Sequence, residues 1–253
     1  MTIRPTRRAF LQTGAAAGAA LAAKDVLLGP ETAEASSGAG PASDRVRFGM
    51  IGVGMQGSGL LSTSITVPGV ECAAACDLYD GRHTLAREIA GPKLRTTRRY
   101  QELLDDKGID CIVAAVPDHW HKKIVVDAVG AGKDVYCEKP LTHTVFEART
   151  LANLAKENNL VTQMGTQIHA LDNYRRVVEL VETEAIGPIQ EVHVWAGAVY
   201  TGGKFTTDTP TPKNLDWDLW LGPAVERPYS EGVHPFNWRR FWDYGTGALG
   251  DFG

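Results

Sequence analysis

The sequence predicts an α/β fold with a doubly wound parallel sheet, followed by a second region of different character. Short apolar segments alternate with segments of helical periodicity between residues 46 and 164. A glycine-rich motif joins the first strand to the first helix, and the alternation stops at Gly165. Strands that alternate with helices form right-handed crossovers, which place helices on both faces of a parallel sheet.

The predicted elements follow one another in a regular order. Buried parallel strands are nearly continuous apolar runs, whereas helices carry apolar residues about every 3.6 positions. We expect strands at Val46–Ile51, Val70–Cys76, Cys111–Val116, Val135–Cys137 and Leu160–Met164. We expect helices from about Gln56 and at Leu85–Ala90, Tyr100–Asp106, His119–Gly130 and Val145–Asn158. Together these elements define a first domain at residues 45–166.

The second region, residues 167–253, begins with regular structure and then becomes irregular. A helix is expected near Asn173–Glu184, then a break, then a long strand at Ile189–Tyr200. Beyond Thr201 the chain is rich in Gly, Pro and Trp and has little periodicity. Long irregular segments in compact proteins are usually functional loops, so we expect this region to contribute to a site.

Residues 1–35 are expected to be an export signal rather than part of the fold. The positive pair Arg7-Arg8 precedes a short run of small and apolar residues, Leu11–Ala23, and residues 33–35 supply an A-x-A cleavage site. The arginine pair before a weakly apolar run resembles a twin-arginine signal. The run is too short to span a bilayer of about 30 Å. We therefore expect a periplasmic or other extracytoplasmic protein without a stable membrane anchor.

Composition narrows the class of protein further. The chain has 253 residues, of which 43% are hydrophobic and 22% charged, with a net charge of −4. These values exclude a disordered chain and give no basis for a nucleic-acid partner.

Residues 36–44 are rich in Ser, Gly and Ala, and we expect them to form a linker. The four cysteines lack C-x-x-C or Cys/His spacing, so we expect reduced thiols and no metal site.

The glycine-rich motif is the first chemical signal. Residues 52–57, Gly-Val-Gly-Met-Gln-Gly, are G-x-G-x-x-G at the end of the first strand. In this motif Gly52 permits a tight turn, Gly54 lets a pyrophosphate approach the backbone, and Gly57 lets helix and strand pack closely. The N-terminus of the following helix attracts phosphate. The motif in this position predicts a dinucleotide cofactor.

Asp77 indicates which dinucleotide binds. It ends the second strand 20 residues after Gly57, where a carboxylate can accept hydrogen bonds from ribose hydroxyls. The same carboxylate would repel a 2′-phosphate, which favours NAD over NADP. Arg82 weakens this preference if it points toward the ribose, but it is also compatible with a solvated charge at a helix start.

Two further motifs follow the third and fourth strands. Pro117 fixes a turn at the carboxyl edge of the sheet, where open α/β sheets bind ligands. His119 and His121 come next, and each alone is also compatible with a polar helix start. Lys139 follows the fourth strand, where a lysine is suited to polarise or deprotonate a substrate hydroxyl. The alternative is a surface pair between Glu138 and Lys139, which contributes little energy.

The order of these motifs resembles the Gfo/Idh/MocA oxidoreductase family over residues 46–253. The resemblance rests on G-x-G-x-x-G, Val116–His121, Cys137–Pro140, Met164–Gln167 and Ile186–Ile189. It implies an N-terminal Rossmann domain and a C-terminal α/β domain with a mostly antiparallel sheet, whose outer face mediates homo-oligomers. It also implies NAD as cofactor, with NADP less favoured, and a small-molecule sugar or glycoside as substrate.

The resemblance also assigns roles to individual residues. Lys139 becomes the catalytic residue. Three Trp- and Gly-rich stretches, Leu215–Pro223, Asn237–Arg239 and Gly245–Gly253, resemble an exported branch of the family, although the tryptophans are equally compatible with core packing. Expected substrate contacts are Lys139, Asn237 and Asp251. Expected cofactor contacts are Gly52, Gly54, Met55, Gln56, Gly57, Asp77, Pro117, His121, Glu138, Lys139, Pro140, Gln167, Trp238 and Arg239.

One departure from the family pattern bears on activity. Family members continue past the Asp-Phe-Gly segment at residues 251–253 to a histidine that exchanges a proton with the substrate. This chain ends at Gly253, so we expect a C-terminally truncated fragment that lacks this histidine.

Three activities stay open from the sequence. They are an NAD-dependent oxidoreductase for sugars or polyols, a redox-neutral NAD-dependent glycosidase, and a non-catalytic nucleotide-binding protein or inactive fragment. Because free NAD is scarce outside the cytoplasm, we expect an exported enzyme to hold its cofactor tightly.

Overall fold

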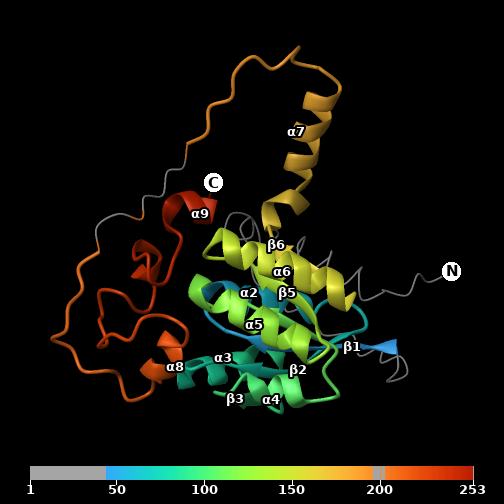
Figure 1. Cartoon of the computed structure of the whole chain (residues 1–253). Coiled ribbons are helices and arrows are strands. Elements are labelled where there is room, and N and C mark those ends of the chain that lie inside the picture. The colour runs from blue at the N-terminus through green and yellow to red at the C-terminus, as the bar shows by residue number, and fades with distance from the viewer. Residues whose placement is uncertain (1–43, 196–199, 201–202, 253) are drawn as a thin grey trace.

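A six-stranded parallel sheet forms the centre of the molecule (Figure 1). The computed structural model describes residues 44–195, 200 and 203–252. The strand order is β3-β2-β1-β4-β5-β6, so the chain winds outward from β1 in both directions. This arrangement confirms the predicted doubly wound sheet. The strands are β1 Val46–Ile51, β2 Val70–Cys76, β3 Arg95–Thr97, β4 Cys111–Ala114, β5 Asp134–Glu138 and β6 Thr162–Gly165.

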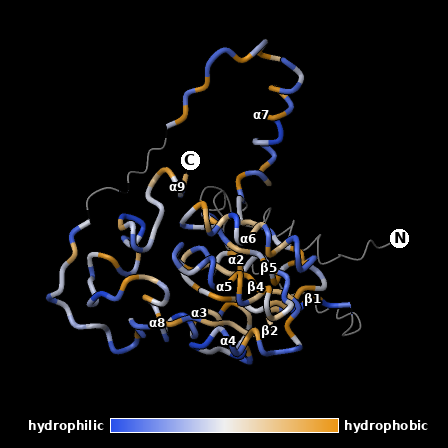
Figure 2. Tube along the Cα trace, in the orientation of Figure 1, coloured by the Kyte–Doolittle hydropathy of each residue, from blue (hydrophilic) through white to orange (hydrophobic). Residues whose placement is uncertain are grey.

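Helices cover both faces of the sheet. Leu60 and Leu61 of α2 and Ala86 of α3 pack with one set of strand side chains, centred on Phe48 and Met50. The apolar sides of α4, α5 and α6 pack on the other face. Figure 2 shows hydrophobic residues gathered in and around the sheet. The helices are α2 Met55–Ser64, α3 Asp80–Ala90, α4 Gln101–Asp105, α5 Asp118–Gly130 and α6 Val145–Asn158.

Helix α6 begins and ends at the predicted residues, and its start has a local cause. The hydroxyl of Thr144 accepts a hydrogen bond from the backbone N–H of Glu147 at 3.2 Å. In return, the Glu147 carboxylate accepts one from the backbone N–H of Thr144, also at 3.2 Å. This capping box satisfies N–H groups that have no partner inside the helix.

Strand β3 was missed in the sequence, and its composition explains why. Its three residues, Arg-Thr-Thr, form no apolar run, and Arg95 is exposed at the edge of the sheet. The strand exists because Arg95, Thr96 and Thr97 pair with the last three residues of β2. Pairing with a neighbour, rather than burial of its own side chains, holds this strand in place.

The expected strand at Ile189–Tyr200 is wrong over residues 189–195, which are irregular and exposed. A strand requires a hydrogen-bonding neighbour, and no other described segment runs beside this one. Residues 196–199 lie outside the described residues. The antiparallel sheet implied by the family resemblance is likewise not formed within residues 167–195 and 203–252.

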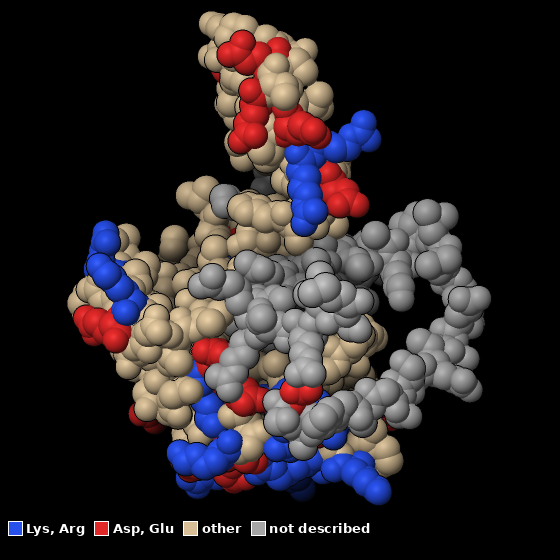
Figure 3. Space-filling model, turned by 90° about the vertical axis from the view of Figure 1, so that its right-hand side faces the viewer, with Lys and Arg blue, Asp and Glu red and all other residues tan. Residues whose placement is uncertain are grey.

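The chain after the sheet forms short helices and one projecting helix. Helix α7 stands away from the body of the molecule (Figure 1). Figure 3 shows acidic side chains gathered on this projection, and mixed charges on the lower part of the same face. The elements are η2 Gln167–Ala170, α7 Asp172–Glu182, α8 Trp217–Leu221, η3 Asn237–Arg240 and α9 Gly247–Phe252.

An aromatic cluster anchors this region to the sheet. Trp217, Trp220, Tyr229, Trp238 and Tyr244 are all buried in it. Residues of the loop that follows β2, including Leu78 and Tyr79, pack against the cluster. The irregular segment therefore lies at the carboxyl edge of the sheet.

The structure does not test the export signal, the linker or the domain boundary. The export signal and the linker up to residue 43 lie outside the described residues. Among the helices that the structure describes, none is long and apolar enough to cross a membrane. The division into domains at residues 166 and 167 stays a prediction.

Candidate active site at the carboxyl edge of the sheet

The glycine-rich motif forms the turn between β1 and α2. Gly52 has a φ of +86°, and a side chain there would collide with the carbonyl oxygen of Ala115. A side chain at Gly57 would collide with the carbonyl oxygen of Gly52, because the helix starts directly against the turn. A Cβ at Gly54, by contrast, would meet nothing within 4 Å. The open side of Gly54 gives a phosphate direct access to the backbone at a helix N-terminus.

Asp77 lies against this turn. Its carboxylate accepts hydrogen bonds from the backbone N–H of Val53 at 2.7 Å and from that of Tyr79 at 3.0 Å. Burial raises the pKa of Asp77, and these two N–H donors oppose the shift. Each carboxylate oxygen has a second lone pair, so Asp77 can hold the turn and still accept a bond from a ribose hydroxyl.

Three polar side chains meet where the winding of the sheet reverses between β1 and β4. The amide nitrogen of Gln56 donates to Glu138 Oε1 at 2.9 Å and to Gln167 Oε1 at 3.3 Å. Burial raises the pKa of Glu138, whereas the bond from Gln56 lowers it. Ligands of doubly wound sheets bind at this reversal point, so the three residues border the expected dinucleotide crevice.

Lys139 follows Glu138 at the same edge of the sheet and is paired with a residue far along the chain. Its Nζ donates to Asp251 Oδ1 at 2.5 Å and to the Asp251 carbonyl oxygen at 2.9 Å. The Nζ also lies 5.1 Å from the centre of the Phe252 ring. Arg239 Nε is 3.7 Å from Asp251 Oδ2. The structure thus brings together Lys139 from the loop after β5, Arg239 from η3 and Asp251 from α9.

The other expected contacts lie in different surroundings. Met55 is exposed at the first turn of α2, and Trp238 is buried in the aromatic cluster with the guanidinium of Arg239 4.2 Å from its ring centre. Asn237 is half-buried in η3. Pro140 follows Lys139 through a cis peptide bond.

His121 joins two loops of the crevice. The residue is only 1% exposed, with Nδ1 2.6 Å from the Pro140 carbonyl oxygen and Nε2 2.9 Å from that of Val116. Burial lowers the pKa of His121, and the charge of Asp118 opposes this. A neutral imidazole has one N–H, so His121 donates to one of these two carbonyl oxygens, and both ring nitrogens are enclosed by the loops after β4 and β5. Pro117 is the N-cap residue of α5 beside it.

Two side chains that the sequence did not single out hold the segment before α9. The Asp118 carboxylate accepts hydrogen bonds from the Thr246 backbone N–H at 3.1 Å and from the Thr246 hydroxyl at 3.0 Å. His143 Nε2 lies 3.0 Å from the Gly245 carbonyl oxygen. An aspartate at a helix start is usually taken for a cap, so its sequence position gives no sign of a partner 128 residues away.

His119 contacts the same region from inside. Its backbone N–H donates to the Tyr244 carbonyl oxygen at 3.2 Å, and its Nε2 lies 3.0 Å from the Trp220 carbonyl oxygen. The indole N–H of Trp120 donates to that same oxygen at 2.9 Å. Burial lowers the pKa of His119 to about 4, so the ring is neutral near pH 7. The first residues of α5 therefore hold the C-terminal segment in place through hydrogen bonds.

A glycine turn at the reversal point, a buried carboxylate against that turn and a lysine at the same edge of the sheet are typical of a Rossmann-type dinucleotide site. Comparison with known protein families supports a dinucleotide-binding fold. Residues 46–166 match the model of an oxidoreductase family with an NAD-binding Rossmann fold. Residues 187–253 match the C-terminal α/β domain of the same family. The chain belongs to the Gfo/Idh/MocA oxidoreductase family, as the order of its motifs predicted.

Two curated proteins illustrate the similarity of this chain to its relatives. Inositol 2-dehydrogenase of Salmonella typhimurium is 28% identical over 150 residues, which are 58% of this chain and 45% of the relative. A glycosyl hydrolase family 109 protein of Saccharopolyspora erythraea is 28% identical over 263 residues, covering 97% of this chain and 52% of the relative. The chain thus spans about half the length of these relatives.

A solved structure shows the same fold. Myo-inositol 2-dehydrogenase of Lactobacillus plantarum superimposes with a TM-score of 0.52 at 29% identity, over 57% of this chain and 43% of that one.

Proposed function

We propose that the protein oxidises a hydroxyl of a sugar or polyol by hydride transfer to a tightly held NAD. The observation that carries the proposal is Lys139, whose Nζ lies beside the Asp251 carboxylate at the carboxyl edge of the sheet. Inositol 2-dehydrogenases among the relatives act on a polyol, as their names state, and they support this substrate class.

The residues present suit a dinucleotide. The open side of Gly54 and the start of α2 would hold the pyrophosphate, and Asp77 would hold the adenosine ribose. The nicotinamide, when bound, accepts the hydride. Lys139 would donate a hydrogen bond to the reacting hydroxyl and polarise it, while Asp251 orients the ammonium group. Glu138 and Gln56 fix the loop that carries Lys139.

NAD is the favoured cofactor in this proposal. Asp77 would lie near the 2′ position of the ribose, where a carboxylate repels a phosphate. Its contacts with Val53 and Tyr79 keep the carboxylate in place.

A redox-neutral glycosidase is the second candidate. In this reaction a sugar carbon is oxidised, the aglycone is eliminated, water adds, and the same hydride returns. The match to the glycosyl hydrolase family 109 protein favours it, because that match extends over both parts of the chain. Turnover of a glycoside without added nucleotide would distinguish this activity from a net oxidation. The non-catalytic alternative has less support, because the family consists of oxidoreductases.

We also propose that the protein is exported by the twin-arginine route and assembles as a homo-oligomer. The Arg7-Arg8 pair and the cleavage site support export. Replacement of both arginines by lysine should leave the protein in the cytoplasmic fraction of an exporting host. Periplasmic recovery of that variant would contradict the route.

The homo-oligomer is tested by sedimentation of the purified protein, which should give a mass of two or more chains.

The first experiment is to purify the protein without added cofactor, denature it and measure the released nucleotide per chain. Tight binding predicts close to one NAD(H) per chain.

The second experiment is the substitution Lys139→Ala, which should abolish turnover of myo-inositol and of glycosides while NAD stays bound. Turnover within a few-fold of the unchanged protein would show that Lys139 does not act on the substrate.

A further inference from the structure

One stretch of the irregular segment joins two loops at the carboxyl edge of the sheet. We call this stretch, residues 212–222, the strap. It contacts the loop after β2, which carries Asp77, and also the start of α5, which follows β4. Strands β2 and β4 are the two neighbours of β1, and β1 leads into the glycine turn. The strap therefore links the loops on either side of the proposed phosphate site.

The first contact of the strap fixes the loop that carries Asp77. Tyr79 of this loop pairs with Leu215 of the strap in an antiparallel bridge. Beside this pair, the first backbone N–H of α3, that of Asp80, donates to the Asn214 carbonyl oxygen at 3.4 Å. Leu215 is 5% exposed and belongs to the aromatic cluster, against which Tyr79 packs. Because the Tyr79 N–H donates to the Asp77 carboxylate at 3.0 Å, a contact that holds Tyr79 also holds Asp77.

The second contact fixes the strap to the start of α5. The Trp220 carbonyl oxygen accepts a hydrogen bond from the Trp120 indole N–H at 2.9 Å and lies 3.0 Å from His119 Nε2. Gly222 has a φ of +48° and lies so close to the Trp120 ring that a side chain there would collide with it. The strap thus ends against the helix that follows β4.

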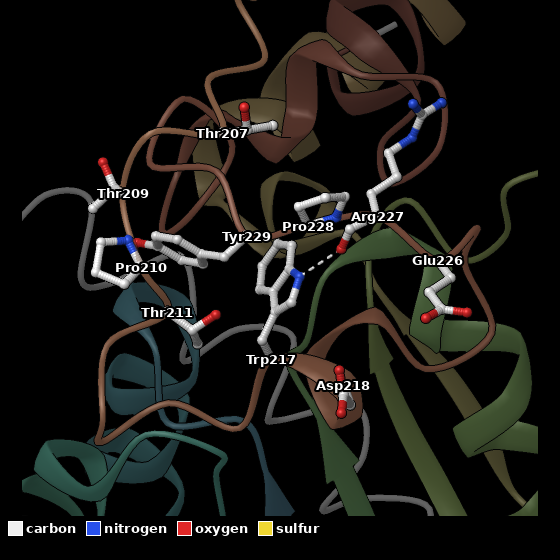
Figure 4. Close-up of a pocket in the computed structure, with 10 residues that line it drawn as sticks. All are labelled: Thr207, Thr209, Pro210, Thr211, Trp217, Asp218, Glu226, Arg227, Pro228 and Tyr229. Atoms are coloured by element: carbon white, nitrogen blue, oxygen red, sulfur yellow. Dashed lines mark hydrogen bonds between the residues drawn. The ribbon is translucent and has the colours of Figure 1, made fainter.

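Helix α8 makes the middle of the strap rigid. The Asp216 carboxylate caps this helix by accepting a hydrogen bond from the Leu219 N–H at 3.0 Å. The indole N–H of Trp217 donates to the Arg227 carbonyl oxygen at 2.8 Å (Figure 4). The ring of Trp217 stacks on that of Trp220, with the ring centres 4.6 Å apart. A segment with this many internal contacts opens as one unit, so its two ends hold their loops together.

We propose that the strap sets how slowly NAD leaves the protein. Asp77 would hold the adenosine ribose, and the strap keeps the loop of Asp77 in the geometry that binds it. Ordering a binding loop in advance raises affinity, and such gains appear mainly as slower dissociation. The inference rests on the proposed function, in which NAD is tightly held, and it explains that tightness. Leu215 is then a positioning residue, because it acts on the nucleotide through Tyr79 and Asp77.

A reversible disulfide between the strap and the loop tests the proposal. The hydrogen bond of the bridge joins Asp80 and Asn214, so Tyr79 and Leu215 form a non-hydrogen-bonded pair. The Cα atoms of such a pair are about 4.5 Å apart, within the range of roughly 4.4–6.8 Å found in disulfides. The variant is therefore Tyr79→Cys/Leu215→Cys.

The native cysteines do not compete for this disulfide. Cys76, Cys111 and Cys137 are buried and Cys72 is half-buried. Burial raises the pKa of the Cys72 and Cys76 thiols to about 12, so little reactive thiolate forms at either residue near pH 8.

The measured quantity is the rate of NADH release. Protein loaded with NADH is mixed with excess NAD, and the loss of NADH fluorescence is followed. The oxidised double variant should release NADH at least tenfold more slowly than the same variant after reduction with dithiothreitol. Because this comparison is made within one variant, a change in stability caused by the substitutions cannot produce it.

Leu215→Ala tests the same contact in the opposite direction. Loss of the buried side chain should release NADH at least tenfold faster than the unchanged protein. Leu180→Ala makes the same substitution on the exposed surface of α7 and should leave the rate unchanged. Equal rates in the oxidised and reduced double variant, within a factor of two, would overturn the proposal, as would an unchanged rate in Leu215→Ala.

NADH release requires no substrate, so the test is independent of turnover. A protein that releases NADH as expected but oxidises no polyol would refute the proposed activity and support the role of the strap. A protein that binds no NADH would refute both.

Discussion

At the scale of single residues, the same type of side chain has different roles in different surroundings. Gly52 and Gly57 are required by the fold, because a Cβ at either position would collide with backbone oxygen atoms. Gly54 has open space on its side, so its importance must come from a ligand. Likewise Lys139 is held by Asp251 at the edge of the sheet, whereas His121 is enclosed between two carbonyl oxygens.

Gly54→Ala should separate folding from cofactor binding. The new methyl group meets no protein atom within 4 Å, so the thermal unfolding midpoint should stay within a few degrees of the original. The same methyl group would occupy the approach of the pyrophosphate and weaken NAD binding at least tenfold by isothermal calorimetry. Gly57→Ala is the contrast, and we expect it to destabilise the fold. Unchanged NAD affinity in Gly54→Ala would place the phosphates elsewhere.

Asp77→Ala should narrow the preference for NAD over NADP. The substitution removes the charge that opposes a 2′-phosphate and also two hydrogen bonds to the glycine turn. Both affinities should fall, and NAD should lose more. The measured quantity is the ratio of the two dissociation constants, with Asp80→Ala as a control on the exposed surface nearby. An unchanged ratio would assign the discrimination to another residue.

Asp118→Asn should loosen the segment that ends in α9. Both hydrogen bonds from Thr246 go to one carboxylate oxygen, Oδ2, and a neutral amide oxygen accepts such bonds more weakly than a charged carboxylate does. We expect faster amide hydrogen exchange over residues 244–252 and faster acetylation of Lys139, because its partner Asp251 lies on that segment. Asp105→Asn is a control on the exposed end of α4. Exchange that rises equally throughout the sheet would indicate a general loss of stability instead.

At the scale of elements, local signals decided which predictions held. The helix at Val145–Asn158 begins and ends where periodicity predicted, and a capping box encoded within four residues stabilises its start. Strands β1 and β2 were also predicted correctly, since they are buried apolar runs. Strand β3 and the expected strand over residues 189–195, which did not form, show the opposite case, because pairing with a neighbour decides both. Periodicity within a segment carries no information on that neighbour.

Thr144→Ala should reduce the stability of the molecule by about 1 kcal/mol, the usual cost of losing an N-cap side chain. The loss should appear in urea unfolding as a lower midpoint with an unchanged slope. Thr150→Ala, in the exposed middle of the same helix, is the matched control. Its hydroxyl bonds only to a carbonyl one turn back, and alanine has the higher helix propensity. Equal losses in the two variants would show that the capping box does not stabilise α6.

At the scale of the whole molecule, the site joins parts of the chain that no local pattern connects. The sequence predicted the glycine turn, Asp77 and Lys139, because each follows a recognisable strand. It did not predict the role of Asp118, whose partner Thr246 lies in a distant irregular segment. Long-range hydrogen bonds of this kind depend on how the C-terminal segment folds back, and that path has no periodic signature.

The stability of the folded molecule should depend on pH through two histidines of the C-terminal region and its contact surface. Burial lowers the pKa of both His119 and His234 to about 4 from a usual value of 6.5. Between these values the unfolded chain binds protons that the folded chain excludes, so the free energy of unfolding should rise as the pH increases from 4 to 6.5. Thermal midpoints across this range would measure it. His119→Asn should flatten the rise, whereas His193→Gln on the exposed surface should not.

The bond between Lys139 and Asp251 spans 112 residues, and this separation has a consequence for how the protein is made. All six strands leave the ribosome before η3 and α9 do. The glycine turn and Asp77 can therefore form and hold a dinucleotide while the lysine is still uncovered. The cost in chain entropy of bringing Asp251 back is met afterwards, on a surface that is already built. Cofactor loading would then precede closure of the crevice, and a nascent chain with nucleotide bound would be the species that completes folding.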